Sequence, residues 1–183
     1  MKELSLNVLD IAMNSVKAKA KNILIKLVEA GDKLTLIIED DGCGMSEETV
    51  QNVMNPFYTT RTTRSVGMGV PLLKLAAEQT GGGITVTSVS EKDNPLEHGT
   101  TVTAEFFTDH LDFTPLGDIV STVTTLIQGA PEIEWRFEHI AEKGSVELDT
   151  KELREILGDV PLDNYEVIKW IDGYLKEGYD AIL

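Results

Sequence analysis

Cysteine and basic residues are both scarce in this sequence. Its single cysteine, Cys43, excludes the intramolecular disulfide framework that small secreted domains use. Its 16 Lys and Arg residues stand against 31 Asp and Glu residues, and the net charge of −15 argues against nucleic acid and anionic membranes as partners. No hydrophobic run approaches the ~20 residues of a membrane span, and no secretory signal opens the chain. We therefore expect a cytoplasmic protein that contacts no nucleic acid and no membrane.

The composition that remains is typical of a globular protein. Hydrophobic residues make up 42% and charged residues 26% of the sequence. The length of 183 residues is enough for one full core and a small appendage. The character of the sequence changes after Asp109. We therefore predict a first domain at 1–109 and a C-terminal appendage at 110–183.

Helical and strand patterns alternate along the first domain, and a polar loop without apolar periodicity covers 55–68. The predicted elements of this domain are helices at 4–20, from 46 and at about 70–79, and strands at 23–28, 34–38, 84–89 and 101–107. For the appendage they are a helix at 116–127, a hairpin of 133–140 with 145–148, and helices at 150–157 and 164–177. This order predicts an α+β fold: a two-layer α/β sandwich followed by a small α+β appendage.

A carboxylate on a glycine-rich turn is the first chemical signal. The segment Asp41-Gly42-Cys43-Gly44-Met45 places Asp41 where a tight turn can hold its carboxylate against an adenine amino group. Guanine would present an acceptor at the same place and would be repelled. Gly42 and Gly44 allow backbone conformations that residues with a Cβ avoid. The segment therefore predicts an adenine-binding turn.

A second glycine motif, Gly67-Met68-Gly69-Val70, follows the first. Glycines let backbone N–H groups approach phosphate oxygens without interference from a Cβ. The polar loop before this motif contains Arg61 and Arg64, and at least one of them is expected to clamp the phosphates when the loop closes. Together the two glycine motifs predict an ATP site.

These motifs resemble those of the GHKL superfamily, which includes gyrase, the large heat-shock chaperone, histidine kinases and the MutL mismatch-repair proteins. The resemblance covers residues 3–107. Its five motifs occur in the family order: an N box at 9–18, the first glycine box, the kinase hinge Asn55-Pro56-Phe57-Tyr58-Thr59-Thr60, the second glycine box and the final Gly99-Thr100. The resemblance implies the histidine-kinase-like ATPase (Bergerat) fold, with ATP and Mg²⁺ as ligands.

Within the N box, Asp10, Asn14 and Lys17 lie at positions i, i+4 and i+7 and therefore share one helix face. An amide oxygen at Asn14 is a suitable Mg²⁺ ligand. Lys17 would reach the phosphates as a point charge. The full set of ATP-binding residues that the resemblance implies is Asn14, Lys17, Asp41, Gly42, Gly44, Met45, Arg61, Arg64, Gly67, Met68, Gly69, Val70 and Thr100.

Asp10 departs from the histidine-kinase pattern, in which asparagine usually occupies this position. Hydrolytic members of the superfamily hold a glutamate there, which activates water as a general base. Asp10 keeps the carboxylate on a shorter side chain and is therefore a candidate catalytic base. The alternative is a supporting role, either behind the metal ligand or in capping the helix.

Two classes of function follow from these assignments. We predict a stand-alone kinase that phosphorylates Ser, Thr or His of a separate partner protein, because the loop resembles the kinase subgroup. No dimerisation hairpin precedes the ATP domain, and no histidine heads a phosphoacceptor helix, so self-phosphorylation is not expected. The alternative is a slow ATPase or an ATP-dependent conformational module that docks a partner when nucleotide is bound. The carboxylate at position 10 favours this alternative.

Overall fold

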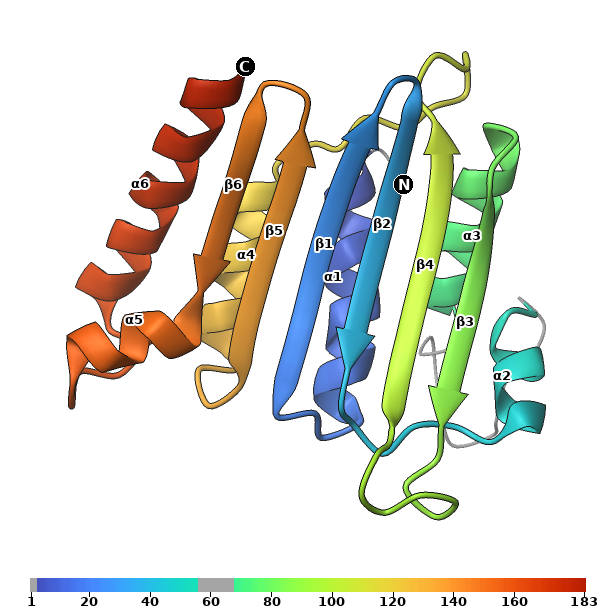
Figure 1. Ribbon diagram of the computed structural model, residues 1–183, viewed down its shortest axis with the longest axis horizontal. Helices are drawn as coiled ribbons and strands as arrows, with labels where there is room; N and C mark the ends of the chain where they lie inside the picture. The colour runs from blue at the N-terminus through green and yellow to red at the C-terminus, as the bar shows by residue number, and fades with distance from the viewer. Residues whose placement is uncertain (1–2, 56–67) are drawn as a thin grey trace.

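The computed structural model describes residues 3–55 and 68–183 and is built on one six-stranded sheet (Figure 1). The strands lie in the order β3-β4-β2-β1-β5-β6. Only the β1–β5 pair is parallel among the five described pairs. The strand bounds are β1 Asn22–Ala30, β2 Lys33–Asp40, β3 Gly83–Val89, β4 Gly99–Phe107, β5 Glu134–Ala141 and β6 Gly144–Asp149.

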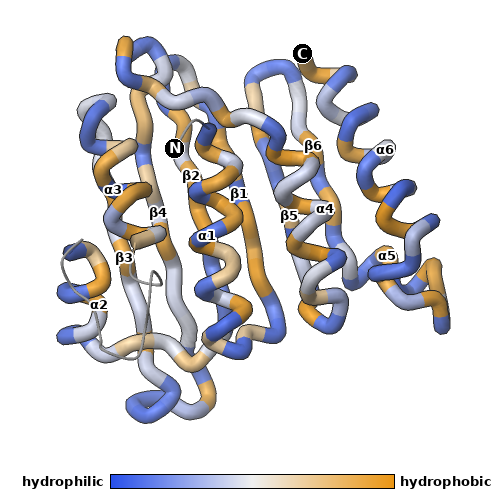
Figure 2. Tube along the Cα trace, turned by 180° about the vertical axis from the view of Figure 1, so that it is seen from behind, coloured by the Kyte–Doolittle hydropathy of each residue, from blue (hydrophilic) through white to orange (hydrophobic). Residues whose placement is uncertain are grey.

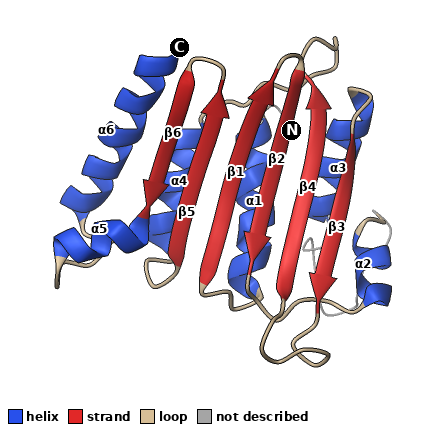
Figure 3. Ribbon diagram, in the orientation of Figure 1, coloured by secondary structure: helices blue, strands red, loops and turns tan. Residues whose placement is uncertain are grey.

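The helices form a second layer on one face of this sheet. Their bounds are α1 Leu4–Lys17, α2 Glu47–Val53, α3 Gly69–Gln79, α4 Ile119–Gly129, α5 Thr150–Leu157 and α6 Tyr165–Ile182. Helices α1, α3 and α4 lie behind the strands, α2 lies beside β3, and α6 runs along the opposite edge beside β6 (Figures 1 and 2). No described helix covers the other face (Figure 3).

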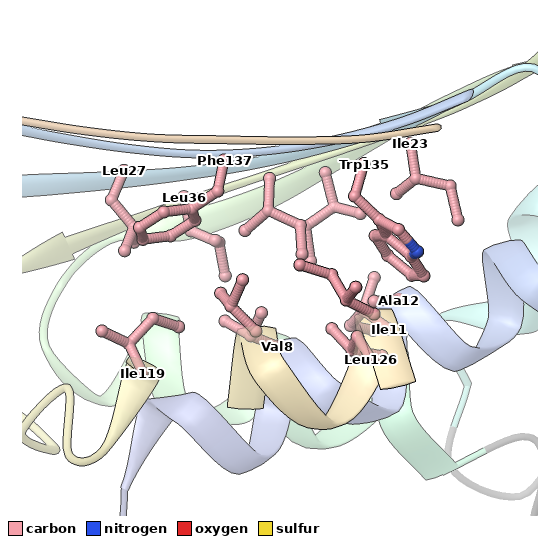
Figure 4. Close-up of a cluster of buried hydrophobic side chains, with 14 of the residues drawn as sticks. Val8, Ile11, Ala12, Ile23, Leu27, Leu36, Ile119, Leu126, Trp135 and Phe137 are labelled. Carbon is pink, nitrogen blue, oxygen red and sulfur yellow. The ribbon is translucent and has the colours of Figure 1, made fainter. Parts of the chain in front are cut away.

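The core lies between the sheet and these helices. Burial along β2 alternates strictly, with Leu34, Leu36 and Ile38 almost fully buried, as expected for a strand covered on one face. Figure 4 shows Val8 and Ile11 of α1 packed under this face, beside side chains of α4 and β5. Each such aliphatic side chain contributes about 1.5–3 kcal/mol by burial.

The α+β fold class predicted from the sequence is confirmed, and the two layers are those expected. The predicted boundary near residue 110 falls in the loop between β4 and α4, and the division into two domains stays a prediction. Residues after this loop extend the same sheet through the parallel β1–β5 pair and share one hydrophobic core with the residues before it. No described helix is long and apolar enough to cross a membrane.

Local chemistry explains where the predicted helix at 4–20 ends. Helix α1 stops at Lys17, and Lys19 adopts a left-handed backbone with φ of 60°. That conformation reverses the chain, so that Ala20 returns to the core and β1 can begin at Asn22.

Candidate functional site

Asp40 ends β2 on the helix-covered face of the sheet. It continues the alternation of Leu36 and Ile38, so its carboxylate points toward α1 rather than toward the open face. The Ser15 hydroxyl donates to Oδ2 of Asp40 at 2.5 Å, and the backbone N–H of Gly42 donates to Oδ1 at 2.9 Å. The carboxylate is thus held in one orientation, yet it stays partly exposed.

Two hydroxyls extend this polar row across the neighbouring strands. Thr100 of β4 lies directly opposite Asp40, and Ser88 of β3 lies directly opposite Thr100. The Ser88 and Thr100 hydroxyl oxygens are 2.8 Å apart, and the N–H of Met45 donates to the Ser88 oxygen at 2.8 Å. A carboxylate and two hydroxyls therefore line one end of the sheet beneath the helix layer.

The first glycine turn is clamped between α1 and the β3–β4 hairpin. A Cβ on Gly42 would lie 2.7 Å from the Cβ of Ala18 and 3.0 Å from Oδ1 of Asp40, so this position accepts no side chain. The N–H of Cys43 donates to the Ala18 carbonyl at 2.9 Å, and His98 Nδ1 donates to the Gly42 carbonyl at 2.5 Å. Hydrogen bonds from both sides fix the turn, and the fixed turn holds the Asp40 carboxylate in place through the Gly42 N–H.

Replacing Gly44 by alanine is expected to destabilise the fold strongly. Gly44 has φ of +69°, which costs about 1–2 kcal/mol in an L-residue, and its Cβ would overlap the Val89 carbonyl. Displacing a packed strand adds roughly 1–3 kcal/mol. Urea unfolding measures the loss. Gly31→Ala is the matched control, because Gly31 has φ of +63° but no atom within 4 Å of its Cβ position. Equal losses in the two variants would contradict the clamp.

The second glycine motif meets the N box. A Cβ on Gly69, the first residue of α3, would lie 3.4 Å from the Cβ of Asp10 and 3.8 Å from Nδ2 of Asn14. Asn14 is half-buried, while Asp10 and Lys17 are exposed on the same helix. The N-cap residue Met68 makes no side-chain hydrogen bond to the first turn of α3. The Met68 side chain therefore occupies none of the first N–H groups of α3, which lie at the helix end beside Asn14.

Asp41, the carboxylate singled out in the sequence, has a different environment from Asp40. Its Oδ1 accepts from the N–H groups of Lys21 at 2.7 Å and Asn22 at 2.9 Å, and its Oδ2 accepts from Nδ2 of Asn22 at 2.8 Å. Asp41 thus ties the end of β2 to the turn before β1. Sequence reasoning missed Asp40, although the alternation that continues from Leu34 to Asp40 could have identified it.

The lowered pKa of Asp41 predicts how the stability of the fold changes at acidic pH. Partial burial raises this pKa, but the hydrogen bonds from the Asn22 side chain and from the Asn22 and Lys21 backbone outweigh that effect and hold it below its usual 3.8. A lowered folded-state pKa stabilises the protein above the unfolded value, and the contribution is lost as the pH falls through the folded value. The stability advantage of wild type over Asp41→Asn should therefore shrink below about pH 4. Urea unfolding at several pH values measures it, and a pH-independent difference would contradict the assignment.

The structure brings together most of the predicted ATP-binding residues but not all of them. Gly42 and Thr100 adjoin Asp40, whereas Met45 is bonded to Ser88 and Gly44 packs against Val89. Asn14 adjoins Gly69 on the neighbouring part of α1. The side chain of Val70 is buried in the core, so only its backbone can face a ligand. Arg61, Arg64, Gly67 and the hinge residues after Asn55 lie outside the described residues.

A cavity of about 1040 Å³ opens at the same end of the sheet. Its described wall includes Lys17, Asp40, Gly42 and Thr100, but not Asn14 or the other residues of the α1–α3 contact. The cavity therefore borders the glycine turn and continues around the ends of the strands.

Comparisons with known proteins agree with this geometry. Residues 1–110 match the family described as Histidine kinase-, DNA gyrase B-, and HSP90-like ATPase. The sensor histidine kinase CpxA of Escherichia coli K12 is 28% identical over 100 residues, which are 49% of this chain and 21% of CpxA. The sensor histidine kinase ZraS of Salmonella typhi is 26% identical over 87 residues, which are 46% of this chain and 18% of ZraS. The chain thus spans about a fifth of the length of these relatives.

Solved structures share the fold over a longer stretch. The MutL ATPase domain of Aquifex aeolicus, solved with ADP, superimposes with a TM-score of 0.55 at 14% identity and covers 86% of this chain and 69% of its own. The N-terminal domain of a DNA repair protein gives a TM-score of 0.57 at 18% identity, over 81% of this chain and 52% of its own. The shared fold therefore extends beyond residue 110. By the match over residues 1–110, the chain belongs to the family of histidine kinase-, DNA gyrase B- and HSP90-like ATPases.

Proposed function

We propose that this chain binds Mg-ATP between α1, the first glycine turn and the start of α3, and that it transfers the γ-phosphate to a partner protein. One observation carries the binding proposal. Two adjacent residues of α1 lie at the two motifs: Ser15 donates to Asp40, which directly precedes the first motif, and Asn14 adjoins Gly69 of the second. Motifs that are separate in sequence therefore meet at a single helix turn, where one ligand can contact both.

Asp40, rather than Asp41, is the proposed adenine ligand. Among the described residues each Asp40 oxygen has one donor, and a carboxylate offers about four acceptor positions, so capacity remains for the adenine amino group. Asp41 accepts three hydrogen bonds that hold the β1–β2 end together. The Thr100 hydroxyl lies beside Asp40 and can contact the same base edge. Guanine would place its carbonyl oxygen against the carboxylate, so the site favours ATP over GTP.

Asn14 is the proposed protein ligand for magnesium. Its side chain is half-buried and makes no hydrogen bond with another described residue, which leaves the amide oxygen available. A single protein oxygen fits Mg²⁺, which completes its octahedral shell with waters and phosphate oxygens. When bound, the ion would neutralise the charge of the phosphate groups. Lys17, one turn further along α1, would contribute a positive charge to the same phosphates.

Phosphate transfer to a partner is the proposed reaction because the curated relatives with similar sequences are named sensor histidine kinases. Two of the three histidines are poorly placed as acceptors: His98 is bonded to the glycine turn, and His139 is buried between Glu29 and Tyr179. The third, His110, is exposed in the loop after β4. Incubation with γ-labelled ATP, with and without a cell lysate, tests the reaction. Label on another protein supports transfer, and label only in free phosphate contradicts it.

Slow hydrolysis is the second candidate, and the position of Asp10 favours it. The carboxylate lies on the helix face that adjoins Gly69, near the proposed phosphate site, and it is exposed to water. A carboxylate in this position can accept a proton from an attacking water. In this alternative the bound nucleotide controls the docking of a partner instead of supplying it with phosphate.

A further inference from the structure

A groove between β6, α5 and α6 lies at the sheet edge opposite α2 and α3 (Figure 1). Its volume is about 280 Å³, and Phe137, Leu148 and Leu153 supply apolar wall. Neither the proposed nucleotide site nor the family match over 1–110 includes residues of α5 or α6. The groove is therefore separate from the proposed nucleotide site.

An exposed aromatic pair forms one side of this groove. Trp170 and Tyr174 lie one turn apart on α6, and their rings stack with centroids 5.1 Å apart and planes 15° apart. The two side chains are 52% and 44% exposed, and Ile156 across the groove is 81% exposed. The core already uses a different stripe of α6, formed by Val167, Ile171 and Leu175. Exposed aromatic and apolar groups around a groove are typical of a protein-binding surface.

The charged side chains around the groove indicate the charge of the molecule that would bind there. Glu147 and Glu152 line it, and neither has a cationic partner within 4.0 Å among the described residues. Arg136 is already engaged by Glu138 at 2.5 Å and Asp149 at 3.2 Å. Residues 142–183 carry eleven acidic and five basic side chains. The occupant should therefore be positively charged, which disfavours a second copy of this acidic chain.

We propose that this groove binds a segment of another protein that presents an arginine next to an apolar side chain. A guanidinium can stack on the Trp170–Tyr174 face and donate to Glu147 or Glu152 at the same time. The apolar neighbour would cover Ile156 and the groove wall. The proposal does not depend on nucleotide binding, so its test uses the protein without nucleotide and can fail independently of the proposed function.

Titration with a short capped peptide of alternating leucine and arginine tests this surface. The signal is tryptophan fluorescence, because Trp170 is exposed whereas Trp135 is buried and donates to the Ala130 carbonyl at 3.0 Å. We expect saturable binding and about tenfold weaker binding of the citrulline peptide, which keeps the shape but loses the charge. Trp170→Phe should abolish the signal, and calorimetry should still detect binding to this variant.

Two double variants of equal net charge separate the groove from general electrostatic attraction. Glu147→Gln with Glu152→Gln should weaken binding of the arginine peptide about tenfold, whereas Glu142→Gln with Glu177→Gln, outside the groove, should change it less than about twofold. Equal effects of the two variants, or equal binding of the citrulline peptide, would overturn the proposal. Self-association that Trp170→Ala disrupts in sedimentation would also overturn it, because the occupant would then be a second copy. Circular dichroism verifies that each variant is folded.

Discussion

Asp40→Asn is expected to weaken ATP binding by about one to two orders of magnitude. Asp40 is held by Ser15 and Gly42 in an orientation that leaves acceptor capacity toward the proposed base site. Asparagine keeps the size but turns one acceptor into an N–H donor, which opposes the adenine amino group. A lost or mismatched hydrogen bond to a charged group costs about 1.5–3 kcal/mol. Calorimetry measures the affinities for ATP and GTP. The ATP affinity should fall, and the preference for ATP over GTP should shrink.

Asp41→Asn provides the matched control, because it removes the same charge one residue away. Its partners are Lys21, in the α1–β1 turn, and Asn22, the first residue of β1. We therefore expect lower stability for this variant and an ATP affinity within about twofold of wild type, since no ligand hydrogen bond is changed. If Asp41→Asn instead abolishes ATP binding and Asp40→Asn does not, Asp41 is the adenine ligand, as the sequence predicted. Equal ATP and GTP affinities in the wild type would contradict the adenine assignment altogether.

The contrast between these two carboxylates shows what a motif alone leaves undetermined. The glycine turn was identifiable because few residues can adopt φ of +69° at Gly44, and because Gly42 has no room for a Cβ. Which of two adjacent aspartates faces the helix layer depends on the phase of the strand, since neighbouring side chains point to opposite faces. The buried row from Leu34 to Ile38 sets that phase, and Asp40 continues it. The alternation of buried residues along the strand therefore indicates which aspartate faces the helices, whereas the glycine motif alone does not.

Long-range pairing limited the prediction of the fold in a similar way. Apolar periodicity identified a strand at 133–140, but it could not show that β5 pairs in parallel with β1, more than a hundred residues earlier. The contact of Gly69 with Asp10 and Asn14 was equally hidden, because helical spacing defines a face and not the element that covers it. Local patterns predicted the elements, while packing between distant elements determined the site.

Asp10→Asn is expected to reduce slow phosphate release by ~10²–10⁴-fold, the usual contribution of a general base. Asp10 is exposed and adjoins Gly69 without belonging to the proposed adenine contacts, so ATP binding should change little. Transfer to a partner protein should persist, because the partner supplies the nucleophile and positioning dominates phosphoryl transfer. Steady-state phosphate release and label transfer, measured on the same preparation, report the two reactions separately.

Two further variants complete this test. Asn14→Ala should reduce both reactions, because each depends on the proposed metal ligand, whereas Asp10→Asn should reduce hydrolysis alone. Asp32→Asn removes an equal charge from the exposed β1–β2 turn and should change neither reaction. Persistent hydrolysis in a clean Asp10→Asn preparation would remove Asp10 from the mechanism and leave the metal and the phosphate site to act without a protein base. Loss of transfer together with hydrolysis would instead place Asp10 in the binding of magnesium or phosphate, because both reactions depend on those steps and Asp10 lies outside the proposed adenine contacts.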